Sequence, residues 1–342
     1  MVDHVLRDFQ RIAWRRWWLL LCAVPLLGLT PAREIGAQTQ GGELLESVVQ
    51  VSATIRRDGR TADTLGTERE GSGVVIDDSG LILTIGYLIL EALEVNVAGA
   101  GPAPVPADIV AYDHESGFGL LRAHQPLGVK PLELGDSDAL LPRQPLLVVS
   151  RIGDFDAAGV YVIDRRVFAG YWEYLLEDAI FTAPPRPDFG GAALIDEAGR
   201  LVGIGSLVVN DAGQLGRPIP GNMFVPINQL KPILGELLAN GRRSDPPRPW
   251  LGVTLEEHRG RVFITRVTPE GPAAEAGVGA DDLILGVAGA PVEGLIDFYR
   301  KLWDLGDAGV EVPLNLLQGM SPETVMVRSG DRYRYLKLDP TF

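Results

Sequence analysis

The sequence has few of the residues that form disulfide bonds or bind metals. It holds one cysteine, Cys22, and four histidines, none of which is spaced from another as in a paired metal-ligand motif. A single cysteine can form neither an intramolecular disulfide nor a thiolate metal site. We therefore predict no metal and no other cofactor.

Positive charge is also scarce. Lys and Arg number 31 against 45 Asp and Glu, which gives a net charge of −14. A protein that binds nucleic acid generally carries a basic face, so we expect no nucleic-acid partner. Long hydrophobic runs are lacking too, because the longest is shorter than the ~20 residues that span a bilayer.

The first 37 residues differ from the rest of the chain. Arg15 and Arg16 precede an apolar run of 13 residues, 17–29, and small residues follow at 36–37. A basic start, a short apolar run and then small residues are typical of a secretory signal peptide. We predict that residues 1–37 are a leader and that the protein is exported to the periplasm. The alternative is an uncleaved leader that anchors the chain to the inner membrane.

The remaining chain indicates two domains, which its length of 342 residues also suggests. Between residues 47 and 226, short apolar runs are separated by turn signals, with hairpins expected around 77–80 and 196–199. This pattern favours a β-sandwich or β-barrel. Apolar residues at helical spacing from Leu230 to Leu238 predict a helix that Gly241 ends. A polar, Pro-rich stretch at 242–248 is the predicted linker.

The second domain is predicted to be a small mixed α/β module. We expect strands at 250–257, 261–267, 282–289 and 310–317, a small-residue turn at 271–277, one long helix near 295–305 and a last strand at 332–338. This combination is typical of a small recognition module.

Several stretches together resemble the HtrA (Deg) family, whose members join a trypsin-like double β-barrel to a PDZ domain. They are GSGVVIDDSGLILT (71–84), LGDSDAL (134–140), FVPI (224–227), PWLGV (249–253) and GPAAEAGVGADDLILGVAG (271–289). The resemblance implies a mainly β fold. The trypsin-like domain would take residues 38–241, the linker 242–248 and the PDZ domain 249–342.

The resemblance also locates the three positions of a Ser-His-Asp catalytic triad, and none of the three residues is present. Tyr87 stands where the family has its histidine, Gly117 where it has its aspartate and Phe189 where it has its serine. A phenol with an ordinary pKa near 10 is a poor general base at neutral pH, and phenylalanine has no nucleophile. We therefore predict no catalytic residues.

The loop that forms the oxyanion hole in the family is degenerate as well. It reads Pro187-Asp188-Phe189, followed by Gly190 and Gly191. Proline has no N–H, so it removes one of the two oxyanion donors. No other serine lies in a G-x-S-x-G context. His114, Glu115 and Ser116 are consecutive, and we expect solvated turn residues there rather than a new triad.

The PDZ domain retains a predicted peptide-binding site. PDZ domains add an extended peptide to a sheet edge and capture its terminal carboxylate with backbone N–H groups. Trp250-Leu251-Gly252-Val253 matches the carboxylate loop that the resemblance implies. Phe298 and Leu302, one helical turn apart, are the predicted wall of the groove; the alternative is that both belong only to the core.

These observations predict a proteolytically inactive HtrA-like protein that binds unfolded polypeptides or protein C-termini through its PDZ domain. It would act in protein quality control or as a regulatory subunit. The alternative is an active serine endopeptidase of the HtrA/Deg type. A homotrimer and a hetero-oligomer with an active relative both remain open as assemblies.

Overall fold

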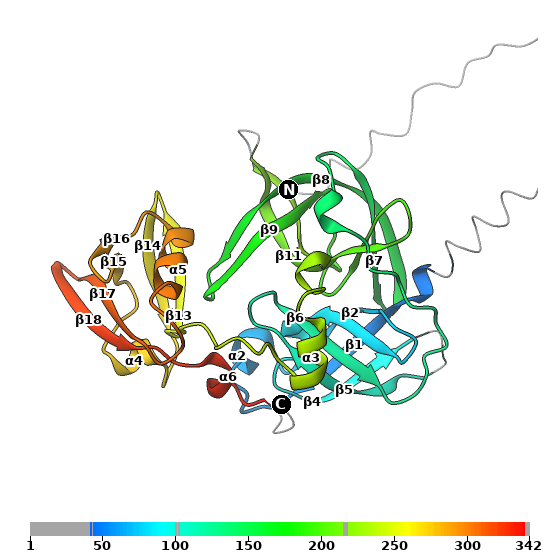
Figure 1. Ribbon diagram of the computed structural model, residues 1–342, viewed down its shortest axis with the longest axis horizontal. Helices are drawn as coiled ribbons and strands as arrows, with labels where there is room; N and C mark the ends of the chain where they lie inside the picture. Colours follow the sequence, from blue (N-terminus) through cyan, green and yellow to red (C-terminus); the bar gives the residue numbers. More distant parts are fainter. Residues whose placement is uncertain (1–41, 43, 100, 102, 215–217, 339–342) are drawn as a thin grey trace, which may run out of the picture. The chain divides into compact units, whose positions relative to one another are not determined.

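The computed structural model describes residues 42, 44–99, 101, 103–214 and 218–338 (Figure 1). These residues belong to one compact unit, Gln40–Phe342. The predicted leader, residues 1–37, lies outside the described residues. In the described part of the chain, no helix is both long and apolar enough to cross a membrane.

The first six strands close into a barrel in the order β1-β2-β3-β6-β5-β4. The strands are β1 (Val48–Ile55), β2 (Glu68–Val75), β3 (Leu81–Ile85), β4 (Ala92–Ala98), β5 (Val105–Tyr112) and β6 (Phe118–Ala123). Short helices α2 (Ala62–Leu65) and η1 (Gly86–Leu88) connect them. The predicted hairpin at 77–80 is confirmed, because the Asp77 carboxylate accepts from the N–H groups of Ser79 and Leu81, each at 2.9 Å.

The next six strands close into a second barrel in the order β10-β11-β12-β9-β8-β7 (Figure 1). They are β7 (Pro145–Ile152), β8 (Asp154–Gly170), β9 (Tyr174–Ala183), β10 (Ala193–Ile195), β11 (Leu201–Gln214) and β12 (Pro218–Pro226). The predicted turn at 196–199 is confirmed, since Asp196 accepts from the N–H of Arg200 at 2.8 Å. The double β-barrel is therefore the one that the sequence predicts.

The C-terminal helix of the barrel region starts later than its apolar spacing predicts. Residues 227–229 form the short helix η3 (Ile227–Gln229), and α3 (Leu234–Asn240) follows; η2 (Ser137–Ala139) lies earlier in the chain. Gly241 ends α3 in the left-handed conformation with φ 73°, as predicted.

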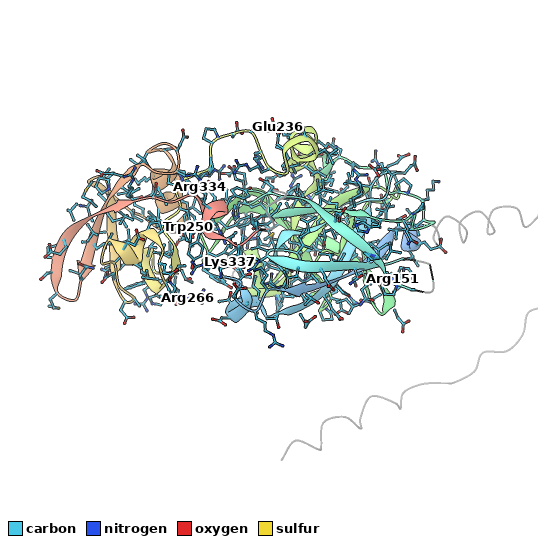
Figure 2. The ribbon with its side chains drawn as sticks, turned by 90° about the horizontal axis from the view of Figure 1, so that it is seen from below. Arg151, Glu236, Trp250, Arg266, Arg334 and Lys337 are labelled. Carbon is cyan, nitrogen blue, oxygen red and sulfur yellow. The ribbon has the colours of Figure 1, made fainter. Side chains whose placement is uncertain are left out.

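The C-terminal region is a six-stranded sheet with β13 at one edge. Its strands are β13 (Val253–His258), β14 (Arg261–Val267), β15 (Leu283–Val287), β16 (Ala290–Pro291), β17 (Glu311–Gln318) and β18 (Ser321–Arg328), and its long helix is α5 (Leu295–Trp303). The predicted helix and the first strands are confirmed. Figure 2 shows the side chains and labels Trp250 just before β13.

Two predictions for this region were wrong, and one strand was missed. The small-residue turn contains a helix, α4 (Pro272–Glu275), which Pro272 starts at a position where its missing N–H costs nothing. The strand predicted at 332–338 contains the helix α6 (Arg332–Tyr335), whose N-cap Asp331 accepts from the N–H of Tyr333 at 2.9 Å. The true last strand, β18, was missed because it opens on the polar residues 321–324.

Candidate functional site

Tyr87 follows β3 and lies in η1. Its hydroxyl donates to the backbone oxygen of Ser206 at 3.0 Å, and Arg69 donates to the backbone oxygen of Tyr87 at 2.7 Å. Burial raises the pKa of the Tyr87 hydroxyl well above its ordinary value near 10. The phenol therefore stays protonated at neutral pH and acts as a hydrogen-bond donor rather than as a base.

Gly117 ends the turn before β6, and its backbone lies in the left-handed region with φ +84°. Its N–H donates to the oxygen of Asp113 at 2.8 Å, and its own oxygen accepts from the N–H of Gly86 at 2.7 Å. A Cβ at this position would lie 3.5 Å from the Tyr174 hydroxyl. Space for a side chain exists, but the backbone conformation favours glycine.

Residues 187–191 connect β9 to β10 and carry Phe189. The oxygen of Gly190 accepts from the N–H of Ser72 at 2.8 Å, and the N–H of Gly191 donates to Gly205 at 2.9 Å. A Cβ on Gly190 would lie 2.9 Å from the Tyr87 hydroxyl. Tyr87 therefore lies against the loop that carries Pro187, Asp188 and Phe189.

The structure thus brings the predicted triad positions together. Gly86 bonds to Gly117, which places the residue before Tyr87 beside the turn of Gly117, and the hydroxyl of Tyr87 reaches the loop of Phe189. Backbone contacts hold these segments in position. At the three positions themselves, Tyr87 has a buried phenol, Gly117 has no side chain and Phe189 has an aromatic ring.

The residues after β5 are not the solvated turn that the sequence predicts. Asp113 and Ser116 are 0% and 1% exposed, because Ser116 donates from both its N–H and its hydroxyl to the Asp113 carboxylate. Arg243 donates to the same carboxylate at 2.8 and 2.9 Å. The ring of His114 contacts the Tyr112 hydroxyl at 3.1 Å, and no hydrogen bond joins it to Ser116 among the described contacts.

The predicted carboxylate loop has the geometry of an anion site. Trp250 and Leu251 are buried, and Gly252 takes φ +79°, which turns the backbone so that successive amides converge. The N–H groups of Leu251, Gly252 and Val253 all donate to one carboxylate, at 2.7, 2.8 and 3.1 Å. That carboxylate belongs to Glu173, a residue that the sequence analysis did not single out.

Glu173 lies in the turn between β8 and β9, and α5 contacts the same turn. The hydroxyl of Tyr299 on α5 donates to Gly170 at 2.6 Å and accepts from the N–H of Glu173 at 3.0 Å. Phe298 and Leu302 on the same helix are fully buried in the apolar cluster that also holds Leu175 of β9. Their assignment to the groove wall stays a prediction.

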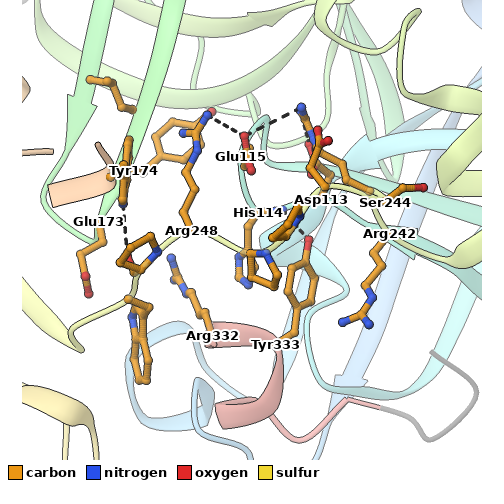
Figure 3. A pocket seen from close by; sticks show the side chains of 18 residues that line it. Asp113, His114, Glu115, Glu173, Tyr174, Arg242, Ser244, Arg248, Arg332 and Tyr333 are labelled. Atoms are coloured by element: carbon orange, nitrogen blue, oxygen red, sulfur yellow. Dashed lines mark hydrogen bonds and ion pairs between the residues drawn. The ribbon is translucent and has the colours of Figure 1, made fainter. Parts of the chain in front are cut away.

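The side chain of Glu173 is buried. Burial raises the pKa of its carboxyl to about 7, although the amides of the loop and the charge of Arg332 act in the opposite direction. A pocket of about 180 Å³ lies beside it (Figure 3), and its lining includes Glu173, Trp250, Arg332, Tyr333, His114 and Arg248.

No group of three or more His, Cys, Asp or Glu side chains within the described ranges could hold a metal ion. The absence of a metal or other cofactor stays a prediction. The sequence carried no signal for Glu173, because its partners lie 78 to 80 residues further along the chain.

Two family profiles match the chain. The trypsin-like peptidase domain matches residues 71–204, and the PDZ domain matches residues 249–328. The fold and these matches define a two-domain protein of the trypsin-like and PDZ class. The limits 38–241, 242–248 and 249–342 stay a prediction.

Several named proteases are similar to this chain over most of its length. The chain is 26% identical to the Arabidopsis thaliana chloroplastic Protease Do-like 1, over 82% of this chain and 68% of that protein. It is 24% identical to the Escherichia coli (strain K12) periplasmic serine endoprotease DegP over 72% of this chain, and 25% identical to a Pseudomonas fulva DegP-like protein over 78%. These matches cover only 54% and 57% of the two bacterial relatives.

Solved structures of HtrA-type proteases share the fold. The HtrA-type protease AlgW with a decapeptide matches with a TM-score of 0.52 at 18% identity, covering 89% of this chain and 99% of that one. A serine endoprotease from Yersinia pestis matches with a TM-score of 0.50 at 21% identity, over 86% and 97%. Together, the two domain matches, the DegP relatives and the HtrA-type structures support placing this chain with the HtrA/Deg proteins.

Proposed function

We propose that this chain is a proteolytically inactive HtrA/Deg protein that binds protein C-termini or unfolded polypeptides through its PDZ domain. It would serve in protein quality control or as a regulatory subunit. The proposal rests on a contrast between two sites. The hydroxyl of Tyr87 donates a hydrogen bond to Ser206 instead of acting as a base, whereas the amides of Leu251–Val253 are all present and bind a carboxylate.

The residues at the triad positions lack the groups that proteolysis needs. Acyl transfer needs a nucleophile, a base near neutral pKa and an oxyanion hole. Phe189 has no nucleophilic atom, the Tyr87 phenol is protonated, and Gly117 has no carboxylate to orient a base. Pro187 lacks one oxyanion donor, a loss that alone typically slows the reaction by about 10²–10³-fold.

Peptide binding is supported by the carboxylate that the loop already holds. Three consecutive amides donate to the two oxygens of Glu173, which shows that the loop can coordinate this group. A terminal carboxylate offers the same two oxygens, and β13 is an edge strand beside which an extended peptide can lie.

The relatives guide the proposals on location and assembly. The bacterial relatives are named as periplasmic endoproteases, which supports export and a periplasmic location for this chain. The leader would be cleaved or retained as an anchor in the inner membrane. We further propose an oligomer, either a homotrimer or a mixed assembly with an active relative.

The full-length protein tests the loss of activity directly. It would be incubated with unfolded casein and with a fluorophosphonate probe that labels activated serines, beside E. coli DegP as the active control. We expect neither cleavage nor labelling. Cleavage together with labelling would overturn the proposal and support the endopeptidase alternative, and the labelled peptide would identify the serine.

A single-residue variant tests the assignment of the site. Phe189→Ser restores a hydroxyl but leaves the base and one oxyanion donor missing, so we expect casein cleavage to remain undetectable. Measurable turnover by this variant would contradict the assigned roles of Tyr87, Gly117 and Pro187.

A further inference from the structure

We propose that residues 171–173 are an internal ligand of the PDZ domain, with the side chain of Glu173 taking the place of a peptide's terminal carboxylate. The groove is then closed to C-terminal peptides until this turn leaves it. The inference rests on the proposed peptide-binding function and adds its regulation.

The first support is the carboxylate itself. Oε1 of Glu173 accepts from Leu251, and Oε2 accepts from Gly252 and Val253, with distances between 2.7 and 3.1 Å. Glu173 is only 9% exposed. A second carboxylate cannot enter the loop while these amides are occupied, because each N–H has a single hydrogen to donate.

The second support is a main-chain bond along the edge strand. The N–H of Leu255 on β13 donates to the oxygen of Tyr171 at 2.8 Å. Val253 and Leu255 are two residues apart on β13, so their N–H groups point to the same side of the strand. Residues 171–173 therefore follow the edge of β13 as an added peptide strand does, with the carboxylate in the loop at its end.

The third support is that other elements hold the turn from both sides. Tyr299 of α5 donates to Gly170 and accepts from the N–H of Glu173, and Arg332 of α6 donates to the oxygen of Trp172 at 3.1 Å. Figure 3 shows Glu173 and Arg332 among the side chains that line the neighbouring pocket.

The backbone of the turn is itself unusual. Glu173 has φ +57°, a conformation that a non-glycine residue rarely takes unless its surroundings impose it. The conformation directs the side chain into the amides of the loop. A turn that served only to reverse the chain between β8 and β9 would carry glycine or asparagine here at less strain.

Occupation of the groove has a quantitative consequence. A peptide binds only the fraction of molecules whose turn has left, so the apparent dissociation constant rises by the inverse of that fraction. The competitor must bring a free C-terminal carboxylate and an extended backbone. A peptide that ends in an amide lacks the group that displaces Glu173.

The test compares peptide binding to the full-length protein and to two variants. The probes are fluorescein-labelled decapeptides that end in Ala, Val, Leu or Phe, each with a free carboxylate or a C-terminal amide. Glu173→Ala removes the internal carboxylate. Glu177→Ala is the matched control. Glu177 lies on β9, four residues after Glu173, and it also reaches α5 by pairing with Arg300 at 2.9 Å, but it is exposed and does not touch the loop.

We expect Glu173→Ala to bind the free-carboxylate peptides about 10-fold or more tightly than the wild type, and Glu177→Ala to match the wild type. The peptides that end in an amide should bind neither the wild type nor either variant. Equal affinity of the wild type and Glu173→Ala for the free-carboxylate peptides would overturn the inference.

Hydrogen exchange separates failure of the inference from failure of the proposed function. In the wild type the amides of Leu251, Gly252 and Val253 should be protected, and in Glu173→Ala they should exchange faster. Faster exchange without any peptide binding would uphold the internal contact and refute peptide binding as the function. Unchanged exchange would refute the internal ligand, whatever the peptides do.

Discussion

The triad positions of the barrels and the carboxylate loop of the PDZ domain are both proposed to be closed to a substrate, but for different reasons. Around Tyr87, Gly117 and Phe189 the backbone is held in place, but the reactive groups are missing. At Leu251–Val253 the functional groups are all present, but Glu173 occupies them. We therefore propose that the first site has no catalytic groups, whereas the second keeps its binding groups and is only blocked.

This difference predicts how each site responds to mutation. A loss spread over three side chains and one backbone donor cannot be reversed at one position, because the missing groups act as a unit. A covered site is freed by removing one carboxylate. The two sites can therefore be separated by single substitutions, and three experiments address the contrast.

The largest expected effect on peptide binding is its loss in Gly252→Pro, made in the Glu173→Ala background so that the groove is open. Proline needs φ near −65°, whereas Gly252 has φ +79°, and proline also removes one of the three amide donors. We expect free-carboxylate decapeptides to lose at least about 100-fold in affinity, measured by fluorescence anisotropy.

Gly260→Pro in the same background is the matched control. Gly260 has φ +73° in the turn between β13 and β14, so proline imposes a similar conflict in the same domain without touching the loop. Circular dichroism would confirm that the barrels remain folded in both variants. Retained affinity in Gly252→Pro, or equal loss in both, would contradict the assignment of the loop.

The second experiment concerns the scaffold around the empty triad position. Asp113 is fully buried, and its carboxylate accepts hydrogen bonds from Arg243 and Ser116. Arg243→Ala leaves this carboxylate without its cation, and breaking a buried pair typically costs about 3–5 kcal/mol. We expect a loss of that size in the free energy of unfolding, measured in urea by tryptophan fluorescence.

Arg248→Ala provides the comparison. Arg248 pairs with Glu115 at 2.6 Å, but its side chain is 41% exposed, so the pair is worth at most about 1 kcal/mol. Similar destabilisation by both variants would show that the Asp113 pair does not hold the turn of Gly117, and that the barrel keeps this turn by backbone contacts alone.

Local sequence signals predicted the parts of the fold that depend on neighbouring residues. The hairpin at 77–80 follows from Asp77, whose side chain bonds to amides two and four residues on. The end of α3 follows from Gly241. The positions of Tyr87, Gly117 and Phe189 could be located because characteristic residues flank each of them.

Features that depend on distant contacts were not predicted. The alternation of Arg and Tyr at 332–335 indicates a strand, but Asp331 caps a helix there and Tyr333 donates to the oxygen of Tyr112, 221 residues away. Ser116 was expected to be solvated, yet Arg243 from beyond α3 closes over its turn. Glu173 had no signal at all, since a lone glutamate in a turn is ordinarily a solvated charge.

The smallest expected effect is a pH dependence of peptide binding that separates the two sites again. The pKa of Glu173 is raised to about 7 by burial from its ordinary value of 4.5. A carboxyl whose pKa is higher when the turn is docked favours docking at low pH. The contribution of Glu173 to docking of the turn is full below pH 4.5, declines between pH 4.5 and 7, and is smallest above pH 7.

The apparent affinity of the wild type for free-carboxylate peptides should therefore rise by about 10- to 100-fold from pH 5 to pH 8.

The other groups that face Glu173 keep one charge state in this range. Arg332 stays a cation, and burial keeps Tyr299 and His114 neutral by raising the pKa of the first and lowering that of the second. In Glu173→Ala the affinity should not change with pH, because the terminal carboxylate of the peptide is ionised throughout. The affinities would be measured by fluorescence anisotropy at both pH values. If the affinity of the wild type does not change with pH, or if that of the variant changes equally, Glu173 does not control access to the loop.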